Sequence, residues 1–154
     1  MTTFPCPGCG GEITTDHVTV NFKHPRTGIC PIDCDESFRL VPLKFYSGLV
    51  EDVMAGRKRK TFRYEDEKEI KAGNVLAIME TVPTRHGDAD PPLRGFATVI
   101  DVEERPIEEF TEYHFAWHTG SDGPEQLAES MRSIYREPIA LQTTVKYIAF
   151  EYHE

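Results

Sequence analysis

The sequence has no long hydrophobic run. No apolar stretch approaches the roughly 20 residues that a membrane-spanning helix needs. Residues 1–6 also lack the positively charged block and the apolar block that open a signal peptide. A membrane-embedded or secreted protein is therefore not expected, and the sequence predicts a cytoplasmic location.

Basic residues are in the minority. The chain has 17 lysines and arginines against 26 aspartates and glutamates, which gives a formal net charge of −9 at pH 7. A protein that coats nucleic acid through bulk electrostatics needs a basic field along its contact surface, so this charge argues against that class. A local basic site remains open, because five of the 17 basic residues lie between Arg57 and Arg63. The competing interpretation of this cluster is an ordinary solvated turn.

Cysteine is scarce and confined to one end of the chain. Cys6 and Cys9 form one pair, within a Cys-Pro-Gly-Cys-Gly-Gly motif, and Cys30 and Cys34 form a second pair. Because cytosolic cysteines are normally reduced, these pairs indicate metal ligands rather than disulfides. Four thiolates satisfy the tetrahedral preference of zinc and leave no position for water. We therefore predict one structural zinc ion held by all four cysteines.

The length and composition indicate one ordinary domain with a small appendage. The chain has 154 residues, 39% hydrophobic and 28% charged, which is in the globular range. We expect a zinc-ribbon-like segment at residues 1–40 and the main domain at residues 41–154. The segment is too small to bury its own core, so it needs a metal or the neighbouring domain. Free cysteines, or His17 or His24 as a substitute ligand, remain alternatives, and alternation at residues 18–22 suggests one short strand.

The main domain is predicted to be of the α+β class. Apolar residues recur at helical spacing over residues 49–54, with Ser47 as a plausible N-cap and Gly56 as the stop. Residues 60–64 then alternate as a strand does, so the basic cluster lies at a helix-to-strand turn. Further strands are expected at residues 75–79, buried on both faces, at residues 95–102 as their partner, and at residues 143–152. Helices are expected near residues 107–115 and from Pro124 onward.

Several short motifs follow one another in a characteristic order over about 105 residues. They are Ala55-Gly56-Arg57-Lys58, Thr61-Phe62-Arg63, residues 71–76, residues 110–114, Ile134-Tyr135 and residues 147–150. With these motifs the stretch from Phe45 to Tyr152 resembles an ASCH domain, a PUA-like β-barrel with flanking helices. It is especially similar to the small bacterial acetylcytidine amidohydrolases.

The resemblance implies a pocket for a nucleic acid or a nucleoside at the mouth of the barrel. In the amidohydrolases the lysine of the turn is the general base and a threonine three residues later is the nucleophile, which implies these roles for Lys58 and Thr61. A glutamate donates the proton in that family. His118 aligns with the glutamate, and an insertion nearby brings Asp122 into consideration instead.

The residue chemistry gives the basic turn two possible roles. A threonine hydroxyl needs a neighbouring base to act as a nucleophile, and a lysine is such a base only where burial or positive charge lowers its pKa. Positive neighbours are present for this purpose. Equally, the same side chains bind phosphate without catalysis. The candidate substrate-binding residues are Arg57, Arg59, Lys60, Arg63 and Trp117, the last as a stacking surface.

We therefore expect a protein that binds RNA or a modified pyrimidine nucleoside and hydrolyses an exocyclic N-acyl group. The alternative is a non-catalytic module that binds RNA or another nucleic acid. Ribonuclease activity, which occurs among ASCH domains, is less favoured because no paired histidines stand at a readable spacing. Attachment of a zinc ribbon favours a nucleic-acid or protein partner over a free nucleoside, whereas the net charge of −9 favours the opposite.

Overall fold

The computed structural model describes residues 3–14, 20, 24–32, 34, 36–64, 68–81, 92–116 and 123–153. Helices and strands are mixed along these residues, as the α+β prediction requires. The strands are β1 (Thr3–Pro5), β2 (Glu12–Thr14), β3 (Arg26–Ile29), β4 (Ser37–Tyr46), β5 (Lys60–Arg63), β6 (Val75–Thr81), β7 (Leu93–Pro106) and β8 (Thr144–His153). The helices are α1 (Ser47–Met54), the 3-10 helix η2 (Ile107–Glu109), α2 (Glu112–Phe115) and α3 (Pro124–Tyr135).

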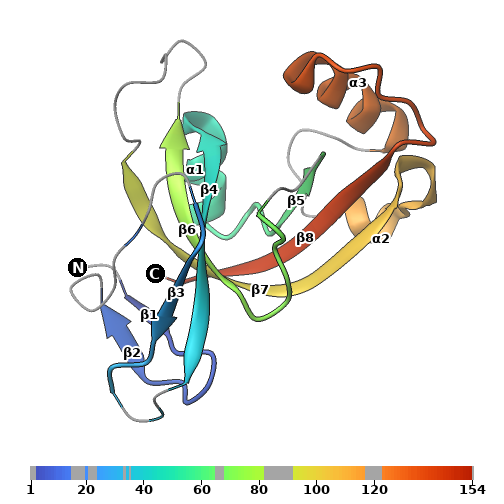
Figure 1. Cartoon of the computed structure of the whole chain (residues 1–154). Coiled ribbons are helices and arrows are strands. Elements are labelled where there is room, and N and C mark those ends of the chain that lie inside the picture. Colours follow the sequence, from blue (N-terminus) through green and yellow to red (C-terminus); the bar gives the residue numbers. More distant parts are fainter. Residues whose placement is uncertain are drawn as a thin grey trace.

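One six-stranded sheet organises the fold, in the order β3-β4-β6-β7-β8-β5 (Figure 1). Strands β4 and β6 are parallel, and the other neighbouring pairs are antiparallel. Strands β1 and β2 form a separate hairpin at the N-terminal end. In Figure 1, α1 lies beside β4 and β6, whereas α2 and α3 lie at the opposite end of β7 and β8.

The sheet is open over the described residues, which corrects the closed barrel that the resemblance implied. Strands β3 and β5 are its two edges, and neither has a second described strand beside it. Strand β5 is only four residues long, and its Thr61 and Phe62 line a cavity together with Leu127 and Met131 of α3. Phe62 of this edge strand therefore packs in one core with Leu127 and Met131 of α3.

Strand β6 is buried on both faces, as predicted. Its Leu76 and Ile78 pack in the core that contains Val50 and Val53 of α1. The alternate residues of β6 face the N-terminal segment; this second core contains Phe4, Ile13, Val75, Ala77, Met79 and Phe96. A third core lies under α2 and α3 at the other end of the sheet. Side chains of β6 therefore join the cysteine segment to the main domain.

The four-cysteine segment and the main domain share a strand. The predicted boundary at residue 40 falls inside β4, which pairs with β3 on one side and with β6 on the other. The segment contributes β1, β2 and β3. Of the strand suggested over residues 18–22, only Val20 is described, and it lies outside any strand.

The local sequence signals predicted the helices correctly, with two exceptions. Helix α1 begins at Ser47 rather than after it, and the Ser47 hydroxyl donates a hydrogen bond to the Thr81 carbonyl oxygen at 3.5 Å. Gly56 has a φ of +77°, which confirms it as the helix stop. The single helix expected near residues 107–115 is broken, because Thr111 is extended and caps α2 through His114. None of the described helices is long and apolar enough to cross a membrane.

Candidate functional site

The four cysteines form one cluster. Their Sγ atoms all lie within 4.8 Å of one another. The Sγ atoms of Cys6 and Cys34 are 3.6 Å apart, and those of Cys9 and Cys30 are 3.7 Å apart. These separations are too long for disulfide bonds, whose sulfurs are about 2.05 Å apart. The first and second cysteine pairs are therefore brought together as reduced thiols.

Backbone turns hold the cysteines in this arrangement. The Gly8 and Gly11 amides donate hydrogen bonds to the Sγ atoms of Cys6 and Cys9, at 3.3 and 3.4 Å. The Cys6 amide donates to the Gly11 carbonyl oxygen at 2.8 Å, which closes the turn. Such amides stabilise sulfur in its anionic form, which is the form that binds a metal.

The donor set fits a tetrahedral metal ion. Four thiolates at about 2.3 Å from one ion are about 3.8 Å from each other, close to the two separations observed. His17 lies outside the described residues, and the cluster found among the described ligand-type residues contains no histidine. The geometry is thus that of a site with four protein ligands, in which no position is left for a reacting molecule.

The basic turn, residues 57–60, is held by backbone hydrogen bonds at both ends. The amides of Arg57 and Lys58 both donate to the Asp52 carbonyl oxygen in α1, at 2.9 and 3.0 Å. At the other end, the Arg59 carbonyl oxygen accepts a hydrogen bond from the Phe150 amide of β8 at 2.9 Å. The side chains of this turn therefore project from a rigid backbone.

Lys58 is buried, with only 2% of its surface exposed. The pKa of Lys58 is lowered to about 7, mainly by burial and also by the positive charge of Arg63, while Asp52 acts in the opposite direction. Arg63 is itself held in place, because its Nη2 donates to the Lys44 carbonyl oxygen at 3.0 Å and its guanidinium lies 4.9 Å from the centre of the Phe45 ring. Near neutral pH a large fraction of Lys58 is therefore the neutral amine.

Lys58 and Thr61 line the same cavity, which we call the Lys58 cavity. Its volume is about 340 Å³, and Arg63 and Tyr46 also line it. Most of the wall is apolar and comes from the four elements β4, α1, β5 and α3: Phe45, Leu49, Phe62, Leu127, Met131 and Ile134. A small number of polar groups inside an apolar hollow is the usual form of a small-molecule site.

The remaining predicted site residues are exposed on the turn, buried away from the Lys58 cavity, or outside the described residues. Arg57 is exposed and paired with Asp52 at 2.8 Å, and Arg59 is exposed, with its Nε donating to the Gly56 carbonyl oxygen at 2.9 Å. Lys60 is buried away from the Lys58 cavity; its ammonium donates to the Tyr113 carbonyl oxygen at 2.6 Å and lies over the Tyr113 ring. Trp117, His118 and Asp122 lie outside the described residues.

Sequence reasoning missed most of the cavity wall. The spacing of Leu127, Met131 and Ile134 predicted a helix and gave no sign that these three side chains line the cavity. One signal was available in retrospect, because Ile134 and Tyr135 belong to the motifs that carry the family resemblance. Ile134 is 57% exposed, as expected for the rim of an opening rather than for a core position.

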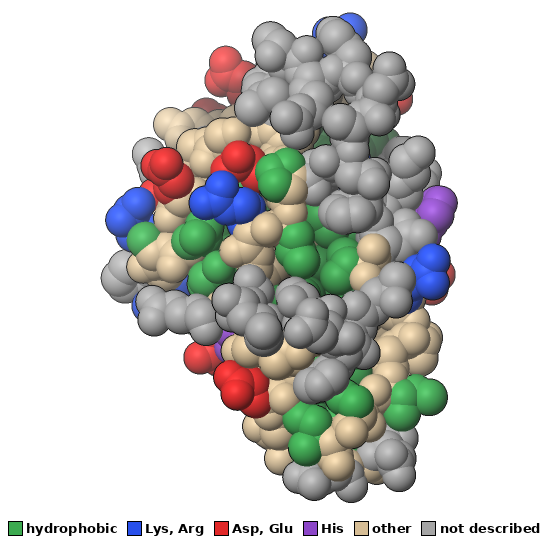
Figure 2. Space-filling model, turned by 90° about the vertical axis from the view of Figure 1, so that its left-hand side faces the viewer, with side chains coloured by type: hydrophobic (Ala, Val, Ile, Leu, Met, Phe, Trp, Pro, Cys, Tyr) green, Lys and Arg blue, Asp and Glu red, His purple; other side chains and the backbone are tan. Residues whose placement is uncertain are grey.

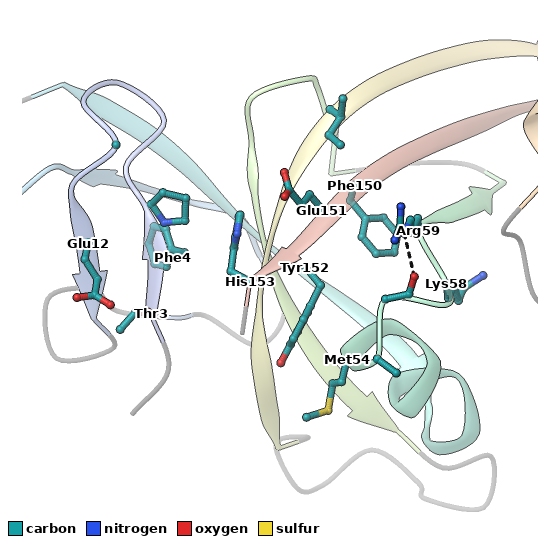
Figure 3. A pocket seen from close by; sticks show the side chains of 15 residues that line it. Thr3, Phe4, Glu12, Met54, Lys58, Arg59, Phe150, Glu151, Tyr152 and His153 are labelled. Carbon is teal, nitrogen blue, oxygen red and sulfur yellow. Dashed lines mark hydrogen bonds between the residues drawn. The ribbon is translucent and has the colours of Figure 1, made fainter.

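A second hollow, which we call the junction cleft, lies between the cysteine segment and the C-terminal strand. Its volume is about 730 Å³. In Figure 3 the hairpin β1–β2, with Phe4 and Glu12, forms one side, and Met54 and Arg59 stand on the other. Tyr152 and His153 of β8 project between these two sides. The His153 Nε2 is hydrogen-bonded to Thr98 Oγ1 at 2.7 Å, which fixes the imidazole ring.

Basic residues are not gathered on the face shown in Figure 2. The described lysines and arginines there are scattered, with acidic side chains among them, and hydrophobic side chains group near the centre. This face offers no continuous basic field, in agreement with the net charge of −9.

No protein-family model matches the chain, and no curated protein matches it by sequence. Three solved structures share its fold. They are an ASCH domain from Lactobacillus crispatus JV V101 (13% identity, TM-score 0.55, 74% of this chain and 80% of that one), the DUF984 protein EF3133 from Enterococcus faecalis V583 (19%, 0.53, 73% and 80%) and the hypothetical protein PH0355 (18%, 0.53, 74% and 99%). About three quarters of this chain therefore has the fold of an ASCH domain.

Proposed function

We propose that this protein binds a modified pyrimidine nucleoside, free or within RNA, in the Lys58 cavity and hydrolyses its exocyclic N-acyl group. Acetylcytidine is the leading substrate, on the strength of the sequence resemblance to the acetylcytidine amidohydrolases. The observation that carries the proposal is that a buried lysine with a pKa of about 7 and a threonine hydroxyl line one apolar cavity.

The residues present suit an acyl transfer through threonine. The neutral amine of Lys58 accepts the proton of Thr61 as the Thr61 Oγ bonds to the acyl carbon. The bond between the acyl carbon and the exocyclic nitrogen then breaks, and the base leaves as a free amine after it gains a proton. Water next cleaves the threonine ester, which releases the acid and restores the hydroxyl.

The proton donor for the leaving amine is assigned to His118 or Asp122, from the resemblance alone. An imidazole titrates near neutral pH and can give a proton there, whereas a carboxyl must first have its pKa raised. Substitution of each residue separately distinguishes them. The true donor should lower turnover by about 100-fold or more when it is removed, and the other should not.

Lys58 belongs to this reaction more readily than to phosphate binding. Within the described residues its ammonium makes no hydrogen bond or ion pair, and it is buried beneath the surface rather than extended into solvent. A phosphate contact favours an exposed, fully charged lysine. The lowered pKa of Lys58 works against that role and in favour of proton transfer.

The cysteine cluster is proposed to hold one zinc ion with a structural role. The four ligands and their spacing support this assignment. Zinc bound there would stabilise the turns that carry β1 and β2, and no step of the proposed hydrolysis passes through it.

The test is incubation with acetylcytidine and, separately, with acetylated RNA, followed by mass spectrometry for cytidine and acetate. Lys58→Ala and Thr61→Ala should each remove nearly all turnover, because members of one nucleophile-base unit fail together. Lys44→Ala is a matched control, since Lys44 lines the same cavity but is exposed. Absence of product from the folded, zinc-loaded wild-type protein on both substrates would refute the hydrolase.

A non-catalytic RNA-binding module is the second candidate, and the exposed arginines of the turn favour it. In that case, Arg57→Gln and Arg59→Gln should weaken RNA binding and reduce its salt dependence by about one logarithmic unit per lost phosphate contact. Lys58→Ala should then have little effect on binding. The two candidates thus differ in which residue of the same turn matters.

A further inference from the structure

We propose that the ligand is a single-stranded polynucleotide, with the target base in the Lys58 cavity and the neighbouring base in the junction cleft. The inference rests on the proposed function, because it takes the Lys58 cavity to hold a base. It adds the class of ligand and a second subsite, which involves the cysteine segment.

The basic turn borders both hollows. Lys58 lines both of them, and Gly56 and Arg59 line the junction cleft. In Figure 3 the end of the Lys58 side chain points away from the junction cleft, so the amine belongs to the smaller cavity. A chain that leaves the Lys58 cavity on this side must therefore cross the turn to reach the junction cleft.

The charge on this path suits the phosphate that joins two nucleotides. Arg57 and Arg59 are both exposed on the turn, and Arg59 also lines the junction cleft. The partner of Arg57 is Asp52, in an exposed ion pair of a kind that contributes little stability and is readily exchanged. The hydrogen bond from Arg59 to the Gly56 carbonyl oxygen, dashed in Figure 3, orients that side chain along the turn.

The junction cleft suits a base rather than a second phosphate. Ile100 and Tyr152 give it apolar and aromatic surface, and Ile100 is 60% exposed. The carboxylates of Glu12 and Glu151 line it as well, and they would repel a phosphate. Carboxylates accept hydrogen bonds from the amino groups of bases, so the cleft has both the stacking surface and the acceptors that a base requires.

One wall of the cleft depends on the cysteine segment. Strand β1 supplies Thr3, Phe4 and Pro5, while Gly10 comes from the turn between Cys6 and Gly11 that positions two of the thiolates. The segment therefore completes a binding surface beside the Lys58 cavity. A free nucleoside would leave that surface unused.

The experiment compares three probes at one salt concentration by equilibrium binding. They are acetylcytidine 5′-monophosphate, a pentaribonucleotide with acetylcytidine at its centre, and the same pentamer with abasic residues on both sides of the acetylcytidine. Recovered probes are checked by mass spectrometry for the acetyl group. Stacking of one flanking base should make the full pentamer bind about 5- to 150-fold more tightly than the abasic pentamer.

Two variants test whether this gain in affinity comes from the junction cleft. Ile100→Ser should lower the affinity for the full pentamer about threefold or more and leave the abasic pentamer unchanged. Ile29→Ser is the matched control, because Ile29 is 64% exposed and lines neither hollow. Equal binding of the full and abasic pentamers, or equal effects of both substitutions, would overturn the second subsite and leave the proposed function standing. Failure of all three probes to bind would remove both.

Discussion

The cysteine cluster and the Lys58 cavity both bring together polar or ionisable side chains from separate parts of the sequence. In the cluster, four sulfurs face one another within 4.8 Å, so a single ion satisfies all of them. In the cavity, the Lys58 amine and the Thr61 hydroxyl are among the polar groups that line a mostly apolar hollow of about 340 Å³. The first arrangement suits one metal ion, whereas the second has room for a small molecule.

This difference shows how geometry separates a stabilising site from a reactive one. Thiolates that are already at metal-ligand spacing contribute the binding energy of the ion to folding. Burial of Lys58 acts in the opposite direction, because it disfavours the charged form of the lysine. We therefore expect the cysteine site to stabilise the fold when it binds a metal and Lys58 to reduce stability.

The largest effect should follow loss of the metal. Cys9→Ser removes a ligand at an exposed position, so the substitution itself disturbs little packing. We expect near one zinc per chain in the wild type, loss of zinc in the variant, and a decrease in the free energy of unfolding of about 3 kcal/mol, or roughly 10 °C in Tm. Elemental analysis and thermal denaturation measure these quantities.

Cys9→His is the control for that experiment, because it retains a nitrogen ligand for zinc. It should keep more metal and more stability than Cys9→Ser. Wild-type protein that melts at the same temperature before and after complete chelation would contradict a structural metal.

Lys58→Met should change the free energy of unfolding by a medium amount, and it should raise it where Cys9→Ser lowers it. The folded pKa of Lys58, about 7, is below its unfolded value of 10.5, so protonated Lys58 destabilises the native state fully below pH 7. This penalty shrinks between pH 7 and 10.5 and is absent above. We therefore expect the variant to be more stable than the wild type by about 1–3 kcal/mol at pH 6, with a smaller gain at pH 9. Chemical denaturation at both pH values measures the difference.

Lys60→Met is the matched comparison, because Lys60 is a second buried lysine two residues further along the chain. Because the Lys60 ammonium donates to the Tyr113 carbonyl oxygen, its removal leaves an acceptor unsatisfied and should destabilise the protein. If both variants shift stability in the same direction, the distinction drawn between the two lysines fails.

The smallest effect concerns the charge beside Lys58. Arg63→Gln removes a positive neighbour that lowers the Lys58 pKa, so that pKa should rise, by less than about one unit because burial is the larger cause. The pH at which turnover is half-maximal should rise with it, since Lys58 acts as the neutral amine. Side-chain NMR titration of Lys58 follows the same shift without turnover. Arg59→Gln should leave the midpoint unchanged, and an equal shift there would point to a general charge effect.

The parts of the fold that could be predicted are those with a local signal. The repeat of Leu127 and Met131 after Pro124 predicted α3, and the apolar run at residues 75–79 predicted β6. Strand β4 was missed, because Pro42 argues against a sheet position. Pro42 is tolerated because the pairing of β3 with β4 extends only as far as Arg26 and Leu40, so β4 has no β3 partner at Pro42. The Pro42 carbonyl oxygen accepts a hydrogen bond from Lys68 Nζ at 2.6 Å.

The features of the candidate site were likewise predictable only where the sequence carries a local signal. The cysteine cluster could be predicted, because ligand type and spacing are written in the sequence. Lys58 and Thr61 could be named from a motif, but not the burial that lowers the Lys58 pKa, since that depends on how α1 and β5 pack in the folded chain. For the same reason Lys60 seemed equivalent to Lys58, although Lys58 lies in the turn and lines the Lys58 cavity, whereas Lys60 begins β5 and its ammonium donates to the Tyr113 carbonyl oxygen.

Strand β4 has a consequence for the modularity of the chain. It runs without interruption from Ser37 to Tyr46, so the cysteine segment is not attached through a linker. Excision of residues 1–36 would remove β1 and β2 and expose the apolar surface formed by Val75, Ala77, Met79 and Phe96. A truncated domain is therefore prone to self-association through that uncovered face. The segment is an integral wall of the domain and not a detachable tag.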